Sequence, residues 1–347
     1  MSAVMLEHCL DLPGVRLFVR EVGSGTPVVV LHGGPDFNHN YLLPEMDQLA
    51  DSCRLIYYDQ RGRGKSSAGV AAEDVTIESE VKDLERLRQH FGFAAMSLLG
   101  HSWGGLLAME YASRHADRVA HLVLMNAAPP SRADLMKFRE ERQAVAATNL
   151  EMMRHIAASP EYVAGDLAAE QHYHRLHYAH ALARRDLAEV VIQRLRVHFS
   201  TEDILKARAI EERLYAQTWL SPGYDLLARL RHCRCPTLVL HGACDFVPLS
   251  CAKHIVDAVP GARLVVFEDC GHFAYLECPD ETFASIRTFV AAAPGDDPLY
   301  DRQVLLLGAK RNAELTLDEI HRYGSDSYGD PDYVSIYGLR PRDWFAK

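Results

Sequence analysis

Runs of apolar residues alternate with amphipathic segments in the first third of the chain. The run 28–31 is wholly apolar and 54–58 is nearly so, which is typical of strands that a parallel sheet buries on both faces. The segment 15–21 instead alternates apolar and polar residues after a Pro13-Gly14 turn, as an antiparallel strand with one solvated face does. The pattern predicts strands over 15–21, 28–31, 54–58, 96–99 and 119–125.

Helices are predicted between these strands. Thr76 is a favourable N-cap for an amphipathic helix that runs to Phe91, and Gly92 is placed to end it. Its apolar positions recur at helical spacing at Ile77, Val81, Leu84 and Leu87. The same reasoning predicts helices over 41–50 and 106–115.

The alternation stops after Pro129-Pro130. The segment 131–220 has no strand pattern and is rich in Ala, Glu, Arg and His, so it predicts several helices before the Pro222-Gly223 turn. The alternation then resumes, with strands predicted over 236–241 and 263–267 and helices over 249–259 and 282–292.

These elements predict an α/β fold with a mostly parallel central sheet flanked by helices. Residues 1–130 and 222–294 would form the core, and 131–221 a helical lid inserted between two strands. Because the insertion leaves the carboxyl end of a strand, where open α/β sheets bind ligands, we expect it to cover the active site. Residues 295–347 form a C-terminal extension, rich in aromatic residues, with a helix predicted over 316–323 and no role assigned.

The composition excludes several classes of partner. A formal net charge of −10 argues against nucleic acid binding, which needs a basic surface. The first ten residues contain Glu7 and His8 and give no signal peptide, and no apolar run of about 18 residues could span a membrane. We therefore expect a cytoplasmic protein that binds neither nucleic acid nor membrane.

The eight cysteines are expected to be reduced. Cys233 and Cys235, with nearby His232, His241 and Cys244, suggest a zinc site, but no C-x2-C pair is present. Buried structural thiols are the favoured interpretation, and no metal is expected.

The segment Gly100-His101-Ser102-Trp103-Gly104 carries the most specific chemical signal. It lies between a predicted strand and a predicted helix, which is the context that a nucleophile elbow requires. In such a turn a serine hydroxyl projects above the edge of the sheet. Ser102 is therefore the candidate nucleophile.

A serine hydroxyl becomes nucleophilic only when a base accepts its proton and a third group orients that base. In this topology the chain order is serine, acid, histidine. Asp245 and His272 each follow the carboxyl end of a predicted strand, at the same sheet edge as Ser102. Glu268 and Asp269 are weaker candidates for the acid.

Acyl transfer also needs N–H donors directed at the oxyanion. The backbone N–H of Trp103, which follows the nucleophile, is one candidate. The other is that of Gly34, because consecutive glycines in His32-Gly33-Gly34-Pro35 allow close approach of the backbone to a substrate.

Two further segments have a structural and a functional interpretation. Residues 59–66 are rich in glycine and basic residues but lack phosphate-loop spacing, so a loop that braces its neighbours is favoured. A lid histidine cluster could bind a metal or substrate, although packing residues are the favoured interpretation. Its members are His172, His174, His177 and His180.

Together these motifs resemble the α/β-hydrolase superfamily, and most closely its proline iminopeptidase branch. The matching segments are His-Gly-Gly-Pro at 32–35, Asp-Gln-Arg-Gly-x-Gly-x-Ser at 59–66, Gly-His-Ser-Trp-Gly-Gly at 100–105, Gly-x-x-Asp ending at 245 and Gly-His at 271–272. The resemblance implies a serine hydrolase without a cofactor that removes an N-terminal residue, often proline. It also implies acidic lid residues that hold the free amine of the substrate.

The chain departs from that pattern in three places. Asp36 stands where the family usually has glycine, the lid has no clear copy of the amine-binding glutamates, and the tail beyond about residue 295 has no counterpart in the family. Glu211-Glu212 is the nearest acidic pair, and a solvated helix face is its favoured interpretation.

The sequence thus predicts a serine hydrolase that cleaves a small ester or amide, in a small molecule or short peptide, through an acyl-enzyme. One alternative is an acyltransferase, an esterase or a lactone-forming or lactone-opening enzyme of a biosynthetic pathway. The other is a non-catalytic protein that senses a ligand with the same fold.

Overall fold

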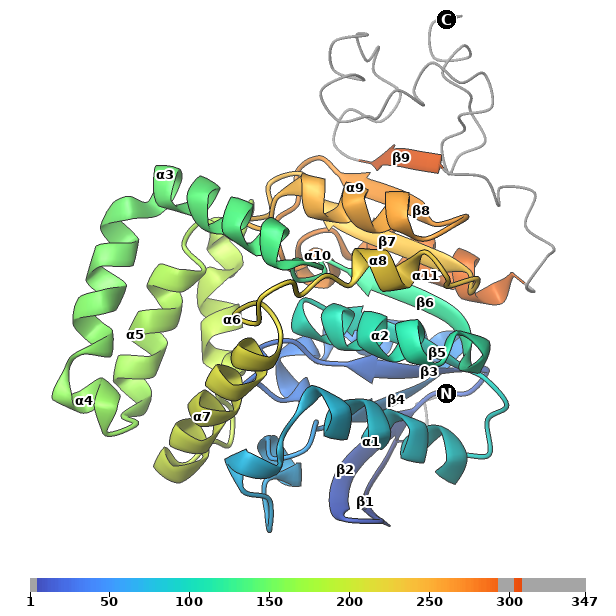
Figure 1. The fold of residues 1–347 in the computed structure, drawn as a ribbon, viewed down its shortest axis with the longest axis horizontal. Helices are drawn as coiled ribbons and strands as arrows, with labels where there is room; N and C mark the ends of the chain where they lie inside the picture. Colours follow the sequence, from blue (N-terminus) through green and yellow to red (C-terminus); the bar gives the residue numbers. More distant parts are fainter. Residues whose placement is uncertain (1–4, 293–302, 308–347) are drawn as a thin grey trace, which may run out of the picture.

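The computed structural model describes residues 5–292 and the backbone of 303–307. Its strands are β1 (Met5–Leu12), β2 (Val15–Val22), β3 (Thr26–Leu31), β4 (Cys53–Tyr58), β5 (Met96–His101), β6 (Val119–Met125), β7 (Thr237–Gly242), β8 (Arg263–Phe267) and β9 (Gln303–Leu307). Within the described residues these nine strands form one sheet in the order β1-β2-β4-β3-β5-β6-β7-β8-β9 (Figure 1). β2 is antiparallel to β1 and β4, and every neighbouring pair from β4 to β9 is parallel. The predicted mostly parallel sheet is confirmed.

The helices connect the strands as the alternation predicts. They are α1 (Ile77–His90), α2 (Trp103–Arg114), α3 (Arg132–Ala157), α4 (Pro160–Val163), α5 (Leu167–His177), α6 (Ala188–Leu195), α7 (Thr201–Gln217), α8 (Leu227–Leu230), α9 (Leu249–Ala258), α10 (Ala274–Glu277) and α11 (Pro279–Ala291). The side chain of Thr76 accepts a hydrogen bond from the Ser79 N–H and so caps α1, as its sequence predicts. Among the described residues, no helix combines the length and apolar composition needed to cross a bilayer.

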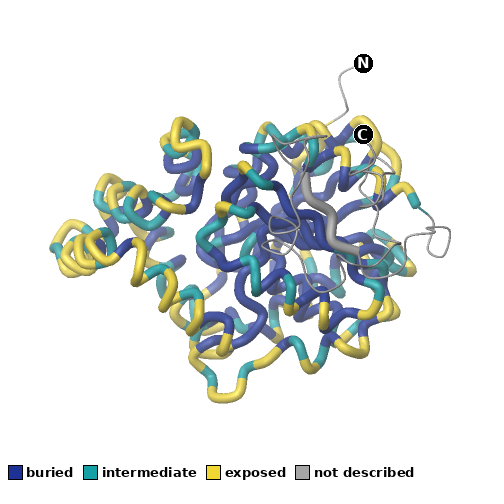
Figure 2. The backbone as a smooth tube through the Cα atoms, turned by 90° about the horizontal axis from the view of Figure 1, so that it is seen from above, coloured by how far each residue is buried: buried dark blue, intermediate teal, exposed yellow. Residues whose placement is uncertain are grey.

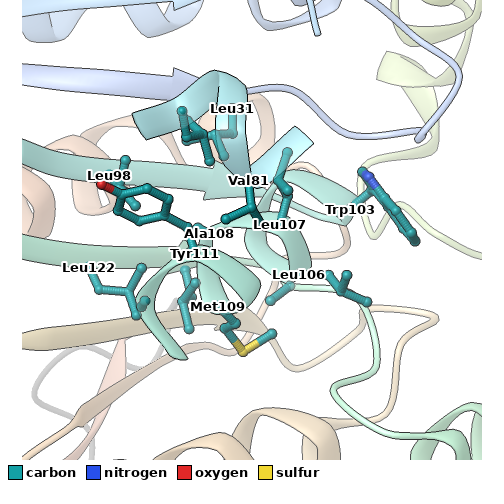
Figure 3. Packing of buried hydrophobic residues seen from close by; sticks show 14 of the residues in the cluster. Leu31, Val81, Leu98, Trp103, Leu106, Leu107, Ala108, Met109, Tyr111 and Leu122 are labelled. Carbon is teal, nitrogen blue, oxygen red and sulfur yellow. The ribbon is translucent and has the colours of Figure 1, made fainter. Parts of the chain in front are cut away.

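The sheet divides the core into two hydrophobic clusters because successive strand residues point to opposite faces. On one face, Leu98 and Leu122 pack with Leu106 and Leu107 of α2 (Figure 3). On the other face, Leu99 belongs to the cluster that includes side chains of α10 and α11. Because side chains pack against both faces of the sheet, the positions of its strand ends are fixed. The loops that begin at those ends therefore start from fixed positions.

Three predictions of elements need correction or completion. Residues 41–50 do not form one helix, because Pro44 interrupts two 3₁₀ segments, η1 (His39–Leu42) and η2 (Glu45–Asp51). Proline disfavours helical backbone at the preceding residue, and Leu43 is extended. Strands β1 and β9 were not predicted. The helix predicted over 316–323 lies outside the described residues.

Helices α3 to α7 lie between β6 and β7 in the chain, where the sequence predicts a helical insertion. In Figure 1 they gather to one side of the sheet, and Figure 2 shows many exposed residues on them beside the buried strands. We call residues 131–221 the helical insertion. It leaves from the carboxyl end of β6, next to the edge at which the candidate site residues stand.

Candidate active site

Ser102 occupies a tight turn between β5 and α2. Its φ of 54° and ψ of −118° are strained for a residue with a side chain. The flanking glycines are required by close contacts. A Cβ at Gly100 would lie 2.3 Å from the Gly104 carbonyl oxygen, and one at Gly104 would lie 2.2 Å from the Leu31 carbonyl oxygen. The strand, turn and helix predicted for a nucleophile elbow are all present.

The structure brings Ser102, Asp245 and His272 together at the carboxyl edge of the sheet. The Ser102 Oγ atom is 3.0 Å from Nε2 of His272. The His272 Nδ1 atom is 2.9 Å and 3.0 Å from the two carboxylate oxygens of Asp245. These are hydrogen-bond distances, so the Ser102 hydroxyl can donate to Nε2 while Nδ1–H donates to Asp245.

The Asp245 carboxylate is fully buried, and N–H donors of the protein take the place of water around it. Burial alone would raise its pKa, but the adjacent His272 holds the pKa of Asp245 below its ordinary value. The Val247 N–H donates to Oδ1 at 2.8 Å and the Asn126 side-chain amide donates to Oδ2 at 2.8 Å. An ionised Asp245 fixes the His272 tautomer in which Nε2 is free to accept a proton.

Asn126 links the acid to the loop of the base. It directly follows β6 and has a φ of 47°, a conformation that asparagine tolerates better than most residues. Its Nδ2 donates to Asp245 and also, at 2.9 Å, to the carbonyl oxygen of Gly271. Sequence reasoning missed this residue, and its place at the carboxyl end of a strand was the one available signal.

The glycine loop after β3 runs beside the nucleophile. A Cβ at Gly33 would lie 3.1 Å from the Ser102 Cβ, and Gly34 has a φ of 120° that favours glycine. Within the described part of the chain, the backbone N–H groups of Gly34 and Trp103 have no hydrogen-bond acceptor. Both predicted oxyanion donors therefore have an unpaired N–H in the described part of the chain.

A buried hydrogen-bond chain joins this loop to the base. The Gly33 N–H donates to the Tyr41 hydroxyl at 2.7 Å, and that hydroxyl donates to Nδ1 of His101 at 2.7 Å. The opposite ring nitrogen of His101 donates to the His272 carbonyl oxygen at 2.9 Å. Burial lowers the pKa of His101 to about 3, so its ring stays neutral and can both accept and donate.

The basic loop 59–66 braces the glycine loop, as predicted. The Gln60 side-chain amide donates to the His32 carbonyl oxygen at 2.8 Å. The two arginines pair with carboxylates of α1: Arg61 with Asp83 at 2.7 Å, and Arg63 with Glu80 at 2.7 Å. These arginines are occupied by carboxylates, which supports the structural interpretation of the loop.

Asp36, the departure from the family pattern, pairs with Arg196 of the helical insertion. The guanidinium contacts both the Asp36 carboxylate and its backbone oxygen, and it lies 3.4 Å from Glu170. Asp36 and Arg196 are only 4% and 3% exposed. Asp36 therefore fixes the glycine loop to the insertion.

We expect Asp36→Asn to lower the free energy of unfolding by about 3 kcal/mol, because it leaves the buried Arg196 with Glu170, at 3.4 Å, as its one carboxylate partner among the described residues. Urea denaturation would measure this change. Glu189→Gln is the matched control, since it breaks an exposed ion pair with Arg175 and should leave the midpoint unchanged. Equal midpoints for both variants and the wild type would contradict the anchoring role of Asp36.

Glu211 and Glu212 of α7 lie in different environments. Glu212 is exposed, as expected, but Glu211 is half-buried. Burial and the negative charge of Asp36 raise the pKa of Glu211 to about 8. The prediction of a solvated helix face is therefore wrong for Glu211. The Tyr215 ring, one turn further along α7, packs against Trp103 with centroids 6.1 Å apart, so α7 contacts the residue that follows the nucleophile.

Aromatic side chains connect the insertion to the base. The Phe246 ring lies 4.7 Å from the His272 ring, and Tyr178 of the insertion lies 5.8 Å from Phe246 and 5.4 Å from Phe273, measured between centroids. His272 is thus shielded from water on this side, which strengthens its hydrogen bonds.

Of the four lid histidines, His174 and His177 pack against aromatic rings, whereas His172 and His180 are exposed. His174 lies 5.6 Å from Phe37 and His177 lies 5.6 Å from Phe246, and burial lowers the pKa values of both histidines. Cys233 and Cys235 are buried free thiols, as favoured. In the portion of the chain that the structure covers, no three His, Cys, Asp or Glu residues gather as metal ligands.

Comparisons with known proteins agree with this architecture. A family profile described as the alpha/beta hydrolase fold matches residues 26–279. The proline iminopeptidase of Saccharolobus solfataricus is 30% identical over 282 residues, which cover 78% of this chain and 86% of that protein. The Lactobacillus helveticus proline iminopeptidase is 28% identical over 302 residues, covering 82% and 98%. The crystal structure of the Mycobacterium smegmatis proline iminopeptidase matches with a TM-score of 0.58 and 25% identity, covering 82% and 98%.

Proposed function

Because this chain belongs to the α/β-hydrolase fold family, we propose that it is a serine hydrolase that uses Ser102, His272 and Asp245 as a catalytic triad. The observation that carries the proposal is the continuous hydrogen-bond chain from the Ser102 hydroxyl through His272 to the buried Asp245. A residue pair in ordinary packing would not need the strained backbone that presents Ser102.

In the acylation step, His272 Nε2 accepts the Ser102 proton while Oγ attacks the carbonyl carbon of an ester or amide. Negative charge develops on the carbonyl oxygen, and the Gly34 and Trp103 N–H groups stabilise it. Asp245 stabilises the imidazolium. The intermediate then collapses as His272 gives the proton to the leaving alcohol or amine, which leaves an ester on Ser102.

In the deacylation step the same groups act on water. His272 accepts a proton from the water molecule, hydroxide adds to the acyl carbon, and the proton returns to Ser102 Oγ as the acid product leaves. We propose that the helical insertion is a lid that keeps other water from this reaction, because its Tyr178 packs beside the aromatic side chains around His272.

Covalent trapping tests the reaction class directly. The wild-type protein should react with a fluorophosphonate probe at one site, and mass spectrometry of its peptides should place the probe on Ser102. Hydrolysis of a p-nitrophenyl ester should stop in step with labelling. Absence of both labelling and hydrolysis would favour a ligand-sensing protein. Faster p-nitrophenol release on addition of an alcohol or amine would favour an acyltransferase.

The carboxyl group of Glu211 supports a substrate with a free amine, as in the proline iminopeptidase relatives. Glu211 lies one helical turn before Tyr215, whose ring packs against Trp103, and its raised pKa of about 8 leaves it largely protonated at neutral pH. A substrate ammonium stabilises the carboxylate form of Glu211. Binding of a substrate with a free amine is therefore expected to strengthen as the pH rises toward about 8, because Glu211 then loses its proton more readily.

We expect Glu211→Gln to raise KM for proline p-nitroanilide by about tenfold, the effect of losing one favourable charge interaction. The variant should also lose the fall in KM with rising pH. KM for a p-nitrophenyl ester without an amine should stay near the wild-type value, and Glu212→Gln, on the exposed neighbour, is the control. Equal changes in KM for both substrates would contradict amine recognition while leaving the serine mechanism intact.

A further inference from the structure

Glu277, the last residue of α10, has a buried carboxylate that four backbone N–H groups contact. One oxygen, Oε1, accepts from Gly271 at 3.1 Å and from Phe273 at 3.2 Å. The other, Oε2, accepts from Ala183 at 2.7 Å and from Arg184 at 3.0 Å. The first pair flanks His272 in the chain, and the second belongs to the helical insertion.

The same two segments also meet through their backbones. The His272 N–H donates to the Ala181 carbonyl oxygen at 2.6 Å. A Cβ at Gly271 would lie 2.2 Å from that oxygen, so only glycine allows the approach. The loop that carries His272 (271–273) is therefore bound to the helical insertion (181–184) through residues on both sides of His272 in the chain.

The carboxylate is not part of an ion pair within the described residues. Glu277 is 6% exposed, and among the described residues its carboxylate accepts hydrogen bonds from backbone N–H groups alone. Burial raises the pKa of Glu277, and these N–H groups oppose the increase. Such a group is costly to bury. A neutral side chain of similar shape would fill the same space, but it could not accept hydrogen bonds at both ends.

We propose that Glu277 is a positioning residue. By binding both the loop that carries His272 and the helical insertion, it holds the His272 imidazole within hydrogen-bond distance of Ser102. This inference rests on the proposed function, because it assigns a reaction role through His272. It also makes the placement of the base depend on the docking of residues 183–184, so the insertion would act on catalysis as well as on access to the site.

The test compares Glu277→Gln with the wild-type protein after active-site titration with a fluorophosphonate. A glutamine accepts at its oxygen alone, so its NH2 group would face one of the two N–H pairs. We expect kcat per titrated site to fall at least about tenfold, because small displacements of a catalytic group are costly, with KM changed less than about threefold. The rate of fluorophosphonate labelling should fall in parallel, since labelling also needs the base.

Asp280→Asn is the matched control, because Asp280 is an exposed carboxylate in the first turn of α11, three positions further along the chain. It should behave as the wild-type protein. Glu277→Asp keeps the charge but is one methylene shorter, so it serves as a second variant if Glu277→Gln does not fold. It should show the same loss of kcat per titrated site.

A purely structural role would give fewer titratable sites with wild-type kcat per site, and that result would overturn the proposal. A spectroscopic readout is independent of turnover: the downfield proton resonance of His272 Nδ1–H should shift or broaden in Glu277→Gln and remain in Asp280→Asn. An unchanged resonance would count against the proposal. A wild-type protein that is neither labelled nor active would instead refute the serine mechanism itself.

Discussion

We expect Ser102→Ala to lower kcat by about 10⁶-fold while the protein remains folded, as for other triad serines. The alanine variant loses the attacking oxygen, so neither the acyl-enzyme nor a fluorophosphonate adduct can form. Its structural cost is small, because the change removes one hydrogen bond to His272 and keeps the same backbone. Ester hydrolysis, probe labelling and a thermal melt would measure the three consequences.

Ser97→Ala provides a close control for that experiment. Ser97 is a buried serine within β5 that, like Ser102, contacts a histidine, with its Oγ 3.1 Å from Nδ1 of His121. It stands near the opposite end of the strand, so its loss should leave turnover unchanged. Wild-type turnover in Ser102→Ala would show that a different group attacks the substrate.

The triad candidates could be selected from the sequence because strand ends could be predicted. Ser102, Asp245 and His272 each follow an apolar run, and parallel strands bring their carboxyl ends to one edge. The same rule made Gly34 a candidate after β3. Position relative to a strand, together with the chain order serine, acid, histidine, therefore separated His272 from the other histidines at strand ends, His32, His101 and His241.

Residues whose role depends on long-range contacts could not be selected in this way. Tyr41, Asn126 and Glu277 are isolated polar residues with no periodic pattern, and each has at least one partner far along the chain. Asp36 was visible as a departure from a family pattern, but its partner Arg196 lies 160 positions away. Glu211 and Glu212 are adjacent and chemically equivalent, so only the rotation of α7 decides which one is half-buried.

The predictions of helices and strands that differ from the structure also have local causes. β1 was missed because most of its residues are exposed, which removes the apolar alternation of a half-buried strand. It is held at the edge of the sheet by pairing with β2 along its full length. Residues 41–50 do not form the expected helix because Pro44 lies within them, and proline has no backbone N–H to donate to a helical hydrogen bond.

Asp245→Asn is the second large effect, with an expected loss in kcat of about 10⁴-fold. An asparagine amide in place of the carboxylate would donate toward His272, which favours the tautomer with the proton on Nε2. That nitrogen could then no longer accept the Ser102 proton. The side-chain NH2 of the new asparagine would also face a second donor, either Nδ2 of Asn126 or the Val247 N–H, both of which now donate to the carboxylate. The pH dependence of kcat and a thermal melt would separate the tautomer effect from loss of folding.

The decisive comparison is with Asp269→Asn, because sequence alone leaves Asp269 as a rival for the acid. In the structure Asp269 is exposed, whereas both carboxylate oxygens of Asp245 lie within hydrogen-bond reach of His272 Nδ1. Asp269→Asn should therefore keep near wild-type kcat. If it were the more damaging substitution, the acid would have been assigned to the wrong loop. The orientation of His272 would then have to come from the β8 side of the site and not from β7.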